Sequence, residues 1–312
     1  MNIRTNIFGG SYKEALLYLI QCITPLHVGT GQSYEGFVDL PIQRDNLGFP
    51  VIWGSSLKGA IRNTFHFHTN SNKDDENRIF GPHSDSIGKE QYSSAILITD
   101  ASLLFMPVRS LYGLFAFCTH YYLLKRFVEM LSICNNSRVG ELKNYIDTYK
   151  DECICSDDYI LKDGKAILRE EEIEIKVDTK LKNLFDNLLP NSFGLKQDIL
   201  RRLVILNDKN ADIIKRSTLI QTRIHLDYEK KTVKKGALWT EEFIPEMSIL
   251  ATTLLIRDEM SNRQDKLKAE DIKKKLKNVL ARSNTDDLNE FYLIIGGNET
   301  LGRGITRFYK IG

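Results

Sequence analysis

Apolar segments with the length and composition of buried β-strands stand at both ends of the chain, and each adjoins a glycine-rich loop. Residues 14–25 are E-A-L-L-Y-L-I-Q-C-I-T-P and predict a buried strand that a proline ends. Residues 291–311 are F-Y-L-I-I-G-G-N-E-T-L-G-R-G-I-T-R-F-Y-K-I and predict a strand, a glycine loop and a final strand. If the terminal strands are neighbours in one sheet, their two glycine loops form one surface.

A strand followed by an amphipathic helix is predicted for residues 51–66, V-I-W-G-S-S-L-K-G-A-I-R-N-T-F-H, with Ser55 or Ser56 as the N-cap. Apolar residues with helical spacing define its core face: Leu57, Ile61 and Phe65. Basic residues with the same spacing form a stripe on another face: Lys58, Arg62 and His66. Because a helix N-terminus also attracts phosphate, this helix is a candidate anion-binding element.

Strands and helices are interleaved elsewhere, which indicates a mixed α and β fold. Strand-type text occurs at 95–108 and 248–256, and helical text at 120–131 and 265–280. Residues 222–245 alternate and turn near Glu229, as a β-hairpin does. The polar segment at 71–78 predicts a surface excursion. The order of elements between about 135 and 220 cannot be deduced from the pattern.

Composition limits the classes of protein that remain. The chain has 312 residues, 42% of them hydrophobic, which is enough for one large or two small packed domains. No apolar run approaches the roughly 20 residues of a membrane helix, and no signal peptide is expected. Five scattered cysteines favour free thiols and a cytoplasmic protein, and in C-I-C at 153–155 a structural role is favoured over metal binding. The net charge of +2 does not by itself indicate a nucleic-acid partner.

The loop segments hold the candidate functional groups. G-G-N-E-T-L-G-R-G, residues 296–304, lets the backbone approach a phosphodiester while its arginine supplies a forked donor, but a ligand-free turn is equally compatible. H-V-G-T-G, residues 27–31, opens a second loop in which the histidine is either structural or functional. This loop extends to Pro50 and places the lone carboxylate of Asp39 between apolar residues. The sequence gives no motif evidence for a zinc hydrolase or a serine hydrolase, since H-E-x-x-H, C-x-x-C and G-x-S-x-G are absent.

An ordered set of motifs carries a family resemblance. T-P-L-H-V-G-T-G, G-F-V-D-L-P-I-Q-R, G-F-P-V-I-W-G-S-S-L-K-G-A-I-R, I-F-G-P, F-M-P-V-R-S, G-A-L-W-T-E-E-F-I-P and I-G-G-N-E-T-L-G-R-G follow one another between residues 24 and 304. Together they resemble the target-cleaving backbone RAMP subunit of type III-B CRISPR effector complexes, the Cmr complex. The equivalent subunit of the type III-A Csm complex is the nearest rival, although V-D-L-P-I-Q-R and L-W-T-E-E-F-I-P are more similar to the III-B form.

The resemblance implies an α+β fold: a single domain over 1–312 with a ferredoxin-like, RRM-type core and insertions. It further implies a catalytic loop at about 26–50, a protruding thumb hairpin at about 222–245 and an insertion or lid at about 135–220. Such subunits stack in a filament along CRISPR RNA, so the implied partners are CRISPR RNA, single-stranded target RNA, further copies of the chain and other Cmr subunits. The resemblance says nothing of the first dozen residues.

Cleavage of target RNA is also implied, with Asp39 at the matching position. Its carboxylate would activate a ribose 2′-hydroxyl or hold a divalent cation, Mg or Mn, and cleavage would leave 2′,3′-cyclic phosphate and 5′-hydroxyl ends. His27 and Glu241 match auxiliary positions, with structural or RNA-binding roles as the alternative. The hairpin lysines then gain an RNA role: Lys230, Lys231, Lys234 and Lys235.

The implied RNA-binding surface draws on the two glycine loops, the first helix and neighbouring motifs. Its residues are Gly29, Gly31, Arg44, Ser55, Ser56, Lys58, Arg62, Arg109, Ser110, Trp239, Gly296, Gly297 and Arg303. Asp45, close to Arg44, is expected to be structural. Two other functions stay open: a non-catalytic RNA-binding scaffold of the same complex, and a guide-processing endonuclease of the RAMP superfamily.

Overall fold

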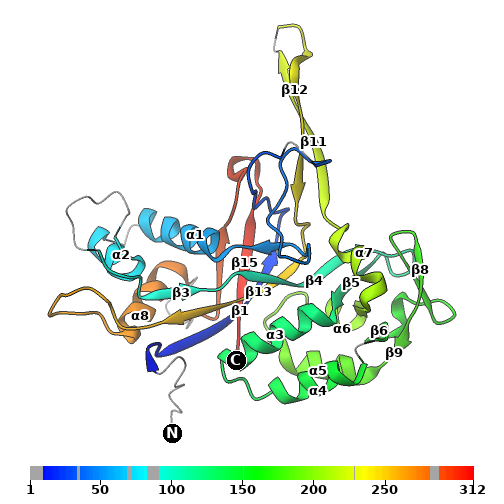
Figure 1. The fold of residues 1–312 in the computed structure, drawn as a ribbon, viewed down its shortest axis with the longest axis horizontal. Helices are drawn as coiled ribbons and strands as arrows, with labels where there is room; N and C mark the ends of the chain where they lie inside the picture. Colours follow the sequence, from blue (N-terminus) through cyan, green and yellow to red (C-terminus); the bar gives the residue numbers. More distant parts are fainter. Residues whose placement is uncertain are drawn as a thin grey trace.

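A large sheet forms the centre of the α+β fold (Figure 1). The computed structural model describes residues 10–33, 36–68, 72–82, 91–149, 151–227, 229–281 and 288–312, without the side chains of residues 235 and 236. In spatial order the strands are β14 (Glu290–Ile294), β15 (Ile305–Ile311), β1 (Glu14–Cys22), β13 (Ile249–Ile256), β4 (Ala101–Arg109), β5 (Phe115–His120), β10 (Leu203–Leu206), β6 (Ile154–Cys155) and β9 (Lys176–Val177). Two short strands pair beside this path: β2 (Val51–Ile52) with β4, and β3 (Ile96–Ile98) with β13.

The terminal parts of the chain build a ferredoxin-like unit. Helix α1 (Gly54–Phe67) lies between β1 and β4 in the chain, and α8 (Ala269–Leu280) lies between β13 and β15. The spatial order β15-β1-β13-β4, antiparallel at every step, is that of a βαββαβ unit. Because β1 pairs with β15, the condition set for the two terminal strands is met, and their glycine loops leave the sheet at the same end of these strands.

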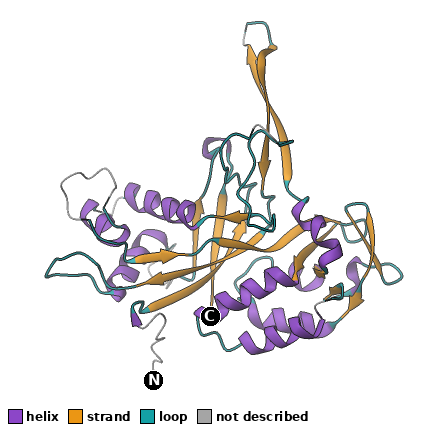
Figure 2. Cartoon of the chain, viewed as in Figure 1, coloured by secondary structure: helices purple, strands orange, loops and turns teal. Residues whose placement is uncertain are grey.

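The segment between β4 and β13 extends this sheet and adds helices. Its helices are α3 (Tyr121–Ile133), α4 (Val139–Tyr149), α5 (Thr179–Leu188), α6 (Lys196–Arg202) and α7 (Ala211–Lys215). A small hairpin, β7 (Lys165–Leu168) with β8 (Glu171–Glu174), lies at its rim. A much longer antiparallel hairpin, β11 (Leu219–Asp227) with β12 (Thr232–Phe243), projects away from the body (Figures 1 and 2). Short 3-10 turns are η2 (Asp158–Ile160), η3 (Asp208–Asn210) and η4 (Glu299–Leu301).

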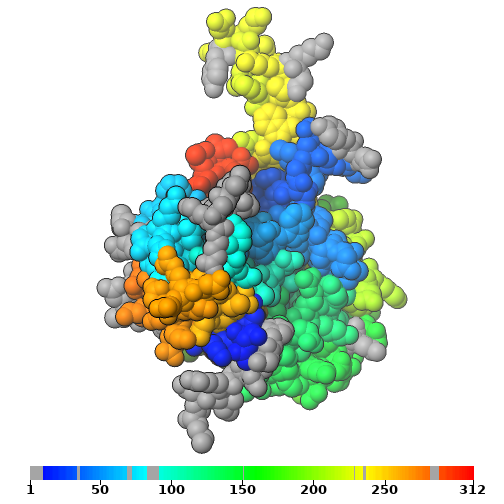
Figure 3. Space-filling view, turned by 60° about the vertical axis from the view of Figure 1, so that its left-hand side comes forward, coloured from blue at the N-terminus to red at the C-terminus, as the bar shows by residue number. Residues whose placement is uncertain are grey.

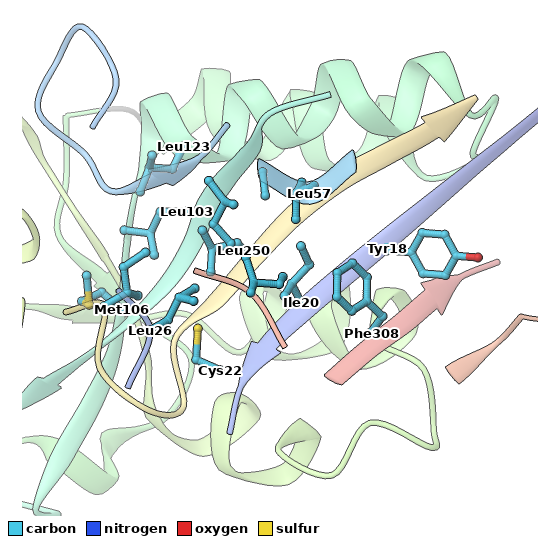
Figure 4. Packing of buried hydrophobic residues seen from close by; sticks show 14 of the residues in the cluster. Tyr18, Ile20, Cys22, Leu26, Leu57, Leu103, Met106, Leu123, Leu250 and Phe308 are labelled. Atoms are coloured by element: carbon cyan, nitrogen blue, oxygen red, sulfur yellow. The ribbon is translucent and has the colours of Figure 1, made fainter. Parts of the chain in front are cut away.

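Alternate residues of β1 divide the core into two layers. Tyr18 and Ile20 pack in a cluster with Leu57 of α1 and Leu276 of α8, part of which appears in Figure 4. Leu17 and Leu19 point to the opposite face, where they join a cluster with residues of α3 to α6. Because helices cover both faces, β1 is a continuous apolar run rather than an alternating one.

Helix α1 keeps its predicted core face but begins differently from the prediction. Leu57, Ile61 and Phe65 are buried, each contributing about 1.5–3 kcal/mol through removal of apolar surface from water. The N-cap is Trp53 rather than a serine, so the prediction of Ser55 or Ser56 is wrong. Instead, Asp100 Oδ1 accepts the N–H of Gly54 at 2.7 Å. A Cβ on Gly54 would lie 2.6 Å from the carbonyl oxygen of Ile98, so a residue with a side chain would clash there and glycine does not.

The described part of the predicted surface excursion at 71–78, residues 72–78, does not form one; residue 71 lies outside the described residues. Helix α2 (Lys73–Phe80) occupies most of this segment, and two of its charged residues, Glu76 and Arg78, are buried. Glu76 accepts hydrogen bonds from Arg62 Nε at 2.7 Å and from His66 at 2.8 Å, while Arg78 Nε donates to buried Glu259 at 2.8 Å. Polar composition gave the wrong answer here because these charges are paired inside the fold.

Other elements follow the sequence pattern closely. The strand-type text at 95–108 divides into β3 and β4, helix α3 starts one residue after His120, and α8 begins at Ala269, later than predicted. The five cysteines are free, four of them buried. Across the described ranges, no helix is both long and apolar enough to cross a membrane.

The Glu76 cluster generates a stability prediction. Burial would raise the pKa of Glu76, but hydrogen bonds from His66 and Arg62 outweigh it and lower the pKa. Glu76→Gln should therefore lower the free energy of unfolding at pH 7 by about 3 kcal/mol, measured by urea denaturation. A lowered carboxyl pKa stabilises the fold above the unfolded-state pKa and ceases to do so as pH falls, so the difference from wild type should shrink between about pH 5 and pH 3.

The matched control is Glu141→Gln at an exposed position of α4, which should change the free energy of unfolding by less than about 0.5 kcal/mol. A deficit of Glu76→Gln that stays equal at pH 7 and pH 3 would contradict the account.

Candidate functional site

The loop at residues 26–50 packs against the base of the long hairpin. Leu26 exchanges backbone hydrogen bonds with Ile244, both at 2.9 Å. Further along, Leu40 forms a parallel bridge with Glu241, donating to Thr240 O and accepting from Glu242 N, each at 3.0 Å. The loop thus bridges the end of β12 at two points. Figure 3 shows the hairpin rising beside this loop, in blue, with the C-terminal glycine loop in red on its other side.

Asp39 is fixed to β12 through Thr240. Asp39 Oδ2 accepts hydrogen bonds from Thr240 N at 2.7 Å and from Thr240 Oγ1 at 2.8 Å. The same hydroxyl accepts the N–H of Asp39 at 3.0 Å. The backbone N–H of Thr240, followed by its hydroxyl, holds the pKa of the Asp39 carboxyl below its usual range. Asp39 is half-exposed, so an ionised carboxylate stands at the surface where loop and hairpin meet.

His27 lies at the start of the same loop and contacts Glu242, which is two residues along β12 from Thr240. Its Nδ1 lies 2.7 Å from the carbonyl oxygen of Glu242 and therefore carries the proton that forms this bond. The ring packs against Phe243 with centroids 5.5 Å apart, and its Nε2 faces Gly29. His27 is thus oriented by β12, with Nε2 as the nitrogen able to accept a proton.

Glu241 links the hairpin to the C-terminal glycine loop. Its Oε1 accepts a hydrogen bond from Trp239 Nε1 at 2.8 Å and its Oε2 from Asn298 Nδ2 at 2.9 Å. Arg223 Nη1 adds an ion pair with Oε2 at 3.8 Å. Because Glu241 is only 5% exposed and both its oxygens are engaged, its geometry is that of a positioning group.

Glu242 is a site residue that sequence reasoning missed. Its carboxylate accepts from Arg44, from Thr218 Oγ1 at 2.6 Å and from Ile42 N at 3.2 Å. Arg44 also donates to Gly48 O at 2.6 Å, so its guanidinium holds the loop together. Successive residues of a strand point to opposite faces, and the two acidic residues of W-T-E-E-F accordingly meet different partners: Glu242 binds the loop at 26–50 and Glu241 binds the C-terminal glycine loop.

Asp45 has the structural role expected of it. Its Oδ1 accepts hydrogen bonds from Leu47 N and Phe49 N, both at 2.9 Å, and its Oδ2 pairs with Arg126 Nη1 at 2.7 Å. These bonds close the turn of the loop and tie it to α3.

The two glycine loops meet directly. Gly297 N donates to His27 O at 2.9 Å. Gly296 has φ +81°, and a Cβ there would lie 2.1 Å from the same carbonyl oxygen, so the contact requires glycine. Arg303 lies over the ring of Phe243 at 5.2 Å and donates to Gln221 of β11 at 3.0 Å. Loop residues from both ends of the chain therefore converge on the hairpin base, together with the exposed Gly29 and Gly31.

The basic stripe of α1 lies elsewhere. Arg62 and His66 face α2 and bind Glu76, as described above. Burial, followed by the charges of Arg62 and Arg257, lowers the pKa of Lys58. At the start of the helix, Ser55 is exposed and Ser56 Oγ accepts from Gln43 Nε2 at 3.1 Å. Gln43 thus joins the first turn of α1 to the loop.

Arg109 and Ser110 lie at the C-terminal end of β4, against β7. Arg109 pairs with Glu170 at 3.1 Å, and Ser110 is buried beside Leu168. Both line a surface cavity of about 470 Å³. Within the described part of the chain, neither shares a hydrogen bond with the loop at 26–50.

The outer part of the hairpin is basic and apolar. Lys230, Lys231 and Lys234 are exposed, and the side chain of Lys235 lies outside the described residues. Apolar side chains are exposed on the same strands: Ile220, Ile224, Leu226, Val233 and Leu238.

Few groups near Asp39 are available to a cation. Considering the described residues only, no cluster of three or more His, Cys, Asp or Glu side chains is arranged to hold a metal ion. Glu241 and Glu242 are occupied by protein donors, whereas the bonds from Thr240 both end on Oδ2 of Asp39. One carboxylate oxygen fits a hydrated magnesium or manganese ion that takes its other ligands from RNA and water, but not an all-protein cage.

Comparisons with known proteins agree with this architecture. The sequence model of the RAMP superfamily matches residues 19–307. A Pyrococcus furiosus protein named CRISPR system Cmr endoribonuclease Cmr4 is 34% identical over 299 residues, covering 94% of this chain and 95% of the relative. CRISPR system CMR subunit Cmr4 of Saccharolobus solfataricus is 28% identical, covering 92% and 94%.

Solved structures share the fold. A chain of the type III-B Cmr-beta complex bound to cognate target RNA has a TM-score of 0.72 and 28% identity, covering 96% of this chain and 98% of that one. Oligomeric Cmr4 from Pyrococcus furiosus has a TM-score of 0.64 and 27% identity, covering 95% and 97%. The RAMP fold implied by the ordered motifs is confirmed. From the family match and the 34% identical relative, the chain belongs to the RAMP superfamily and, within it, to the family of Cmr4 proteins.

Proposed function

We propose that this chain binds CRISPR RNA as a repeated subunit of a type III-B effector complex and cuts complementary target RNA at regular intervals. The observation that carries the proposal is an ionised carboxylate, Asp39, at the foot of a projecting hairpin where both glycine loops converge. The endoribonuclease name of one relative and the target-RNA complex of another support it. Those relatives are Cmr4 proteins and type III-B structures, which favours this assignment over the type III-A equivalent.

The chemistry that fits one carboxylate is attack of a ribose 2′-oxygen on its own 3′ phosphorus. The O2′–P bond forms as the P–O5′ bond breaks, the 2′ proton leaves to the carboxylate or to water, and O5′ takes a proton from water. The products are a 2′,3′-cyclic phosphate and a 5′-hydroxyl end. In-line placement of the RNA contributes most to such a reaction, so one acidic group per subunit suffices.

The lowered pKa of Asp39, caused by the Thr240 N–H and hydroxyl, bears on its role. A carboxylate with a lowered pKa is a weak base, yet it stays ionised and attracts cations at neutral pH. We therefore favour Asp39 as the holder of a divalent cation, magnesium or manganese, over Asp39 as the base. When bound, such a cation would stabilise the charge that develops on the phosphoryl group.

The RNA-binding surface of this proposal is centred on the hairpin base. Backbone N–H groups of the two glycine loops and the guanidinium of Arg303 are suited to phosphate contacts. The exposed hairpin lysines are suited to bind the guide-target duplex. In contrast, the engagement of Arg44 and Arg62 with Glu242 and Glu76 favours structural roles for these arginines. Free cysteines are compatible with action in the cytoplasm, and further copies and other Cmr subunits are the proposed protein partners.

Asp39→Asn tests the assignment of the carboxylate. In the assembled complex the variant should bind target RNA within about twofold of wild type and lose at least about 100-fold in single-turnover cleavage at every regularly spaced site, because only the charge is removed. The control is Asp147→Asn, the same change on the exposed surface of α4. Normal cleavage by Asp39→Asn would refute the catalytic assignment.

Metal removal tests the cation. Excess EDTA should stop cleavage of labelled target by the wild-type complex without releasing the RNA, and excess magnesium or manganese should restore it. Cleavage that continues in EDTA would refute the cation while leaving Asp39 as a candidate base. A complex that binds target RNA but does not cut it, whichever divalent metal is added, would instead support the non-catalytic scaffold.

A further inference from the structure

Asp39 and Thr240 form a closed network of hydrogen bonds across 201 residues of sequence. The Thr240 hydroxyl donates to Asp39 Oδ2 at 2.8 Å and accepts the Asp39 N–H at 3.0 Å, while Thr240 N donates to Oδ2 at 2.7 Å. Two donors from one residue converge on one carboxylate oxygen, and the hydroxyl also holds the backbone that carries the carboxylate. Both the rotation and the location of the side chain are therefore fixed.

This arrangement leaves the two carboxylate oxygens unequal. Oδ2 is occupied by Thr240, whereas among the described residues no other residue donates a hydrogen bond to Oδ1. Rotation of the carboxylate by half a turn would exchange the oxygens, but the fixed positions of the hydroxyl and the amide confine the plane to one orientation. A half-exposed carboxylate without such donors would sample several rotamers.

Thr240 also relates Asp39 to one face of the hairpin. Directly paired residues of antiparallel strands point to the same face, so Thr240 shares its face with Thr222, and Leu238 with Ile224. Alternation along β12 places Leu238 and Thr240 on one face. Ile224 and Leu238 are 47% and 62% exposed, so the hydroxyl that donates to Asp39 lies next to an exposed apolar surface of the hairpin.

We propose that Thr240 is a positioning residue for RNA cleavage: its hydroxyl orients the Asp39 carboxylate so that Oδ1 faces the RNA lying against this side of the hairpin. The inference rests on the proposed function, in which Asp39 is the reacting carboxylate. Thr240 itself does not touch the reacting atoms. It acts by converting a mobile surface carboxylate into one with a single orientation.

The test compares four variants of the assembled complex. Thr240→Val removes the hydroxyl, keeps the side-chain shape and keeps the backbone N–H bond, and valine suits a strand. Thr240→Ser keeps the hydroxyl. Thr222→Val makes the same change at the directly paired position on β11, whose described contacts do not include Asp39. Asp39→Asn reports whether the carboxylate is needed at all. Target affinity and the single-turnover rate constant of cleavage are measured for each.

Thr240→Val should lower the rate constant by about 10- to 100-fold, as expected when a hydrogen bond to a charged, positioning group is lost, with target affinity within about twofold of wild type. Thr240→Ser and Thr222→Val should remain within about threefold. A merely structural role would lower affinity and rate together, and serine would not restore the rate selectively.

The outcomes separate the two claims. If Asp39→Asn cuts normally, the proposed function fails at its catalytic residue. If Asp39→Asn is inactive and Thr240→Val cuts within about twofold of wild type, the proposed function stands and the positioning role of Thr240 is overturned. Equal losses in Thr240→Val and Thr222→Val would also overturn it, because the effect would then belong to the hairpin face rather than to the bond with Asp39.

Discussion

The candidate site depends on contacts made by the last four residues of β12, Thr240–Phe243. Thr240 holds Asp39, Glu241 holds the C-terminal glycine loop, and Glu242 holds Arg44 and the backbone at Ile42. The Glu242 carbonyl and the Phe243 ring orient His27. Four consecutive residues thus position the candidate groups through alternating faces of one strand. The same strand continues into the projecting hairpin, so Asp39 is bonded to the strand that carries the hairpin.

The surrounding fold makes this convergence possible. Because β1 and β15 are antiparallel neighbours in the ferredoxin-like unit, the loops that follow β1 and precede β15 meet at the same end of these strands. The contact of Gly296 with the His27 carbonyl then joins them closely. The large sheet with helices on both faces supplies the rigid support, and the half-exposed carboxylate of Asp39, bound to β12 of the separate hairpin sheet, is what the RNA can reach. Rigid support and an accessible group therefore come from two different sheets.

Sequence periodicity predicted the elements that bury an apolar face, and it failed where charges are buried. Leu57, Ile61 and Phe65 indicated α1 correctly, since helical spacing records which face meets the core. Residues of α2 suggested a surface segment because nothing in local composition reveals that Glu76 meets Arg62 and His66. The N-cap of α1 was missed for the same reason, as Asp100 lies 46 residues away from Gly54. Ordered motifs indicated Asp39, but its partner Thr240 is separated by 201 residues, and local spacing cannot predict such a bond.

The most direct measurement of the central claim is the structure of the assembled complex with target RNA that carries 2′-deoxyribose at the cleavage positions, so that it binds but is not cut. The account predicts that Asp39 Oδ1, with Thr240 still bound to Oδ2, lies within hydrogen-bond reach of the missing 2′ position or its phosphate, directly at about 3 Å or through one water or cation. Asp39 turned away from the backbone at every cleavage position, or separated from it by protein, would contradict the account.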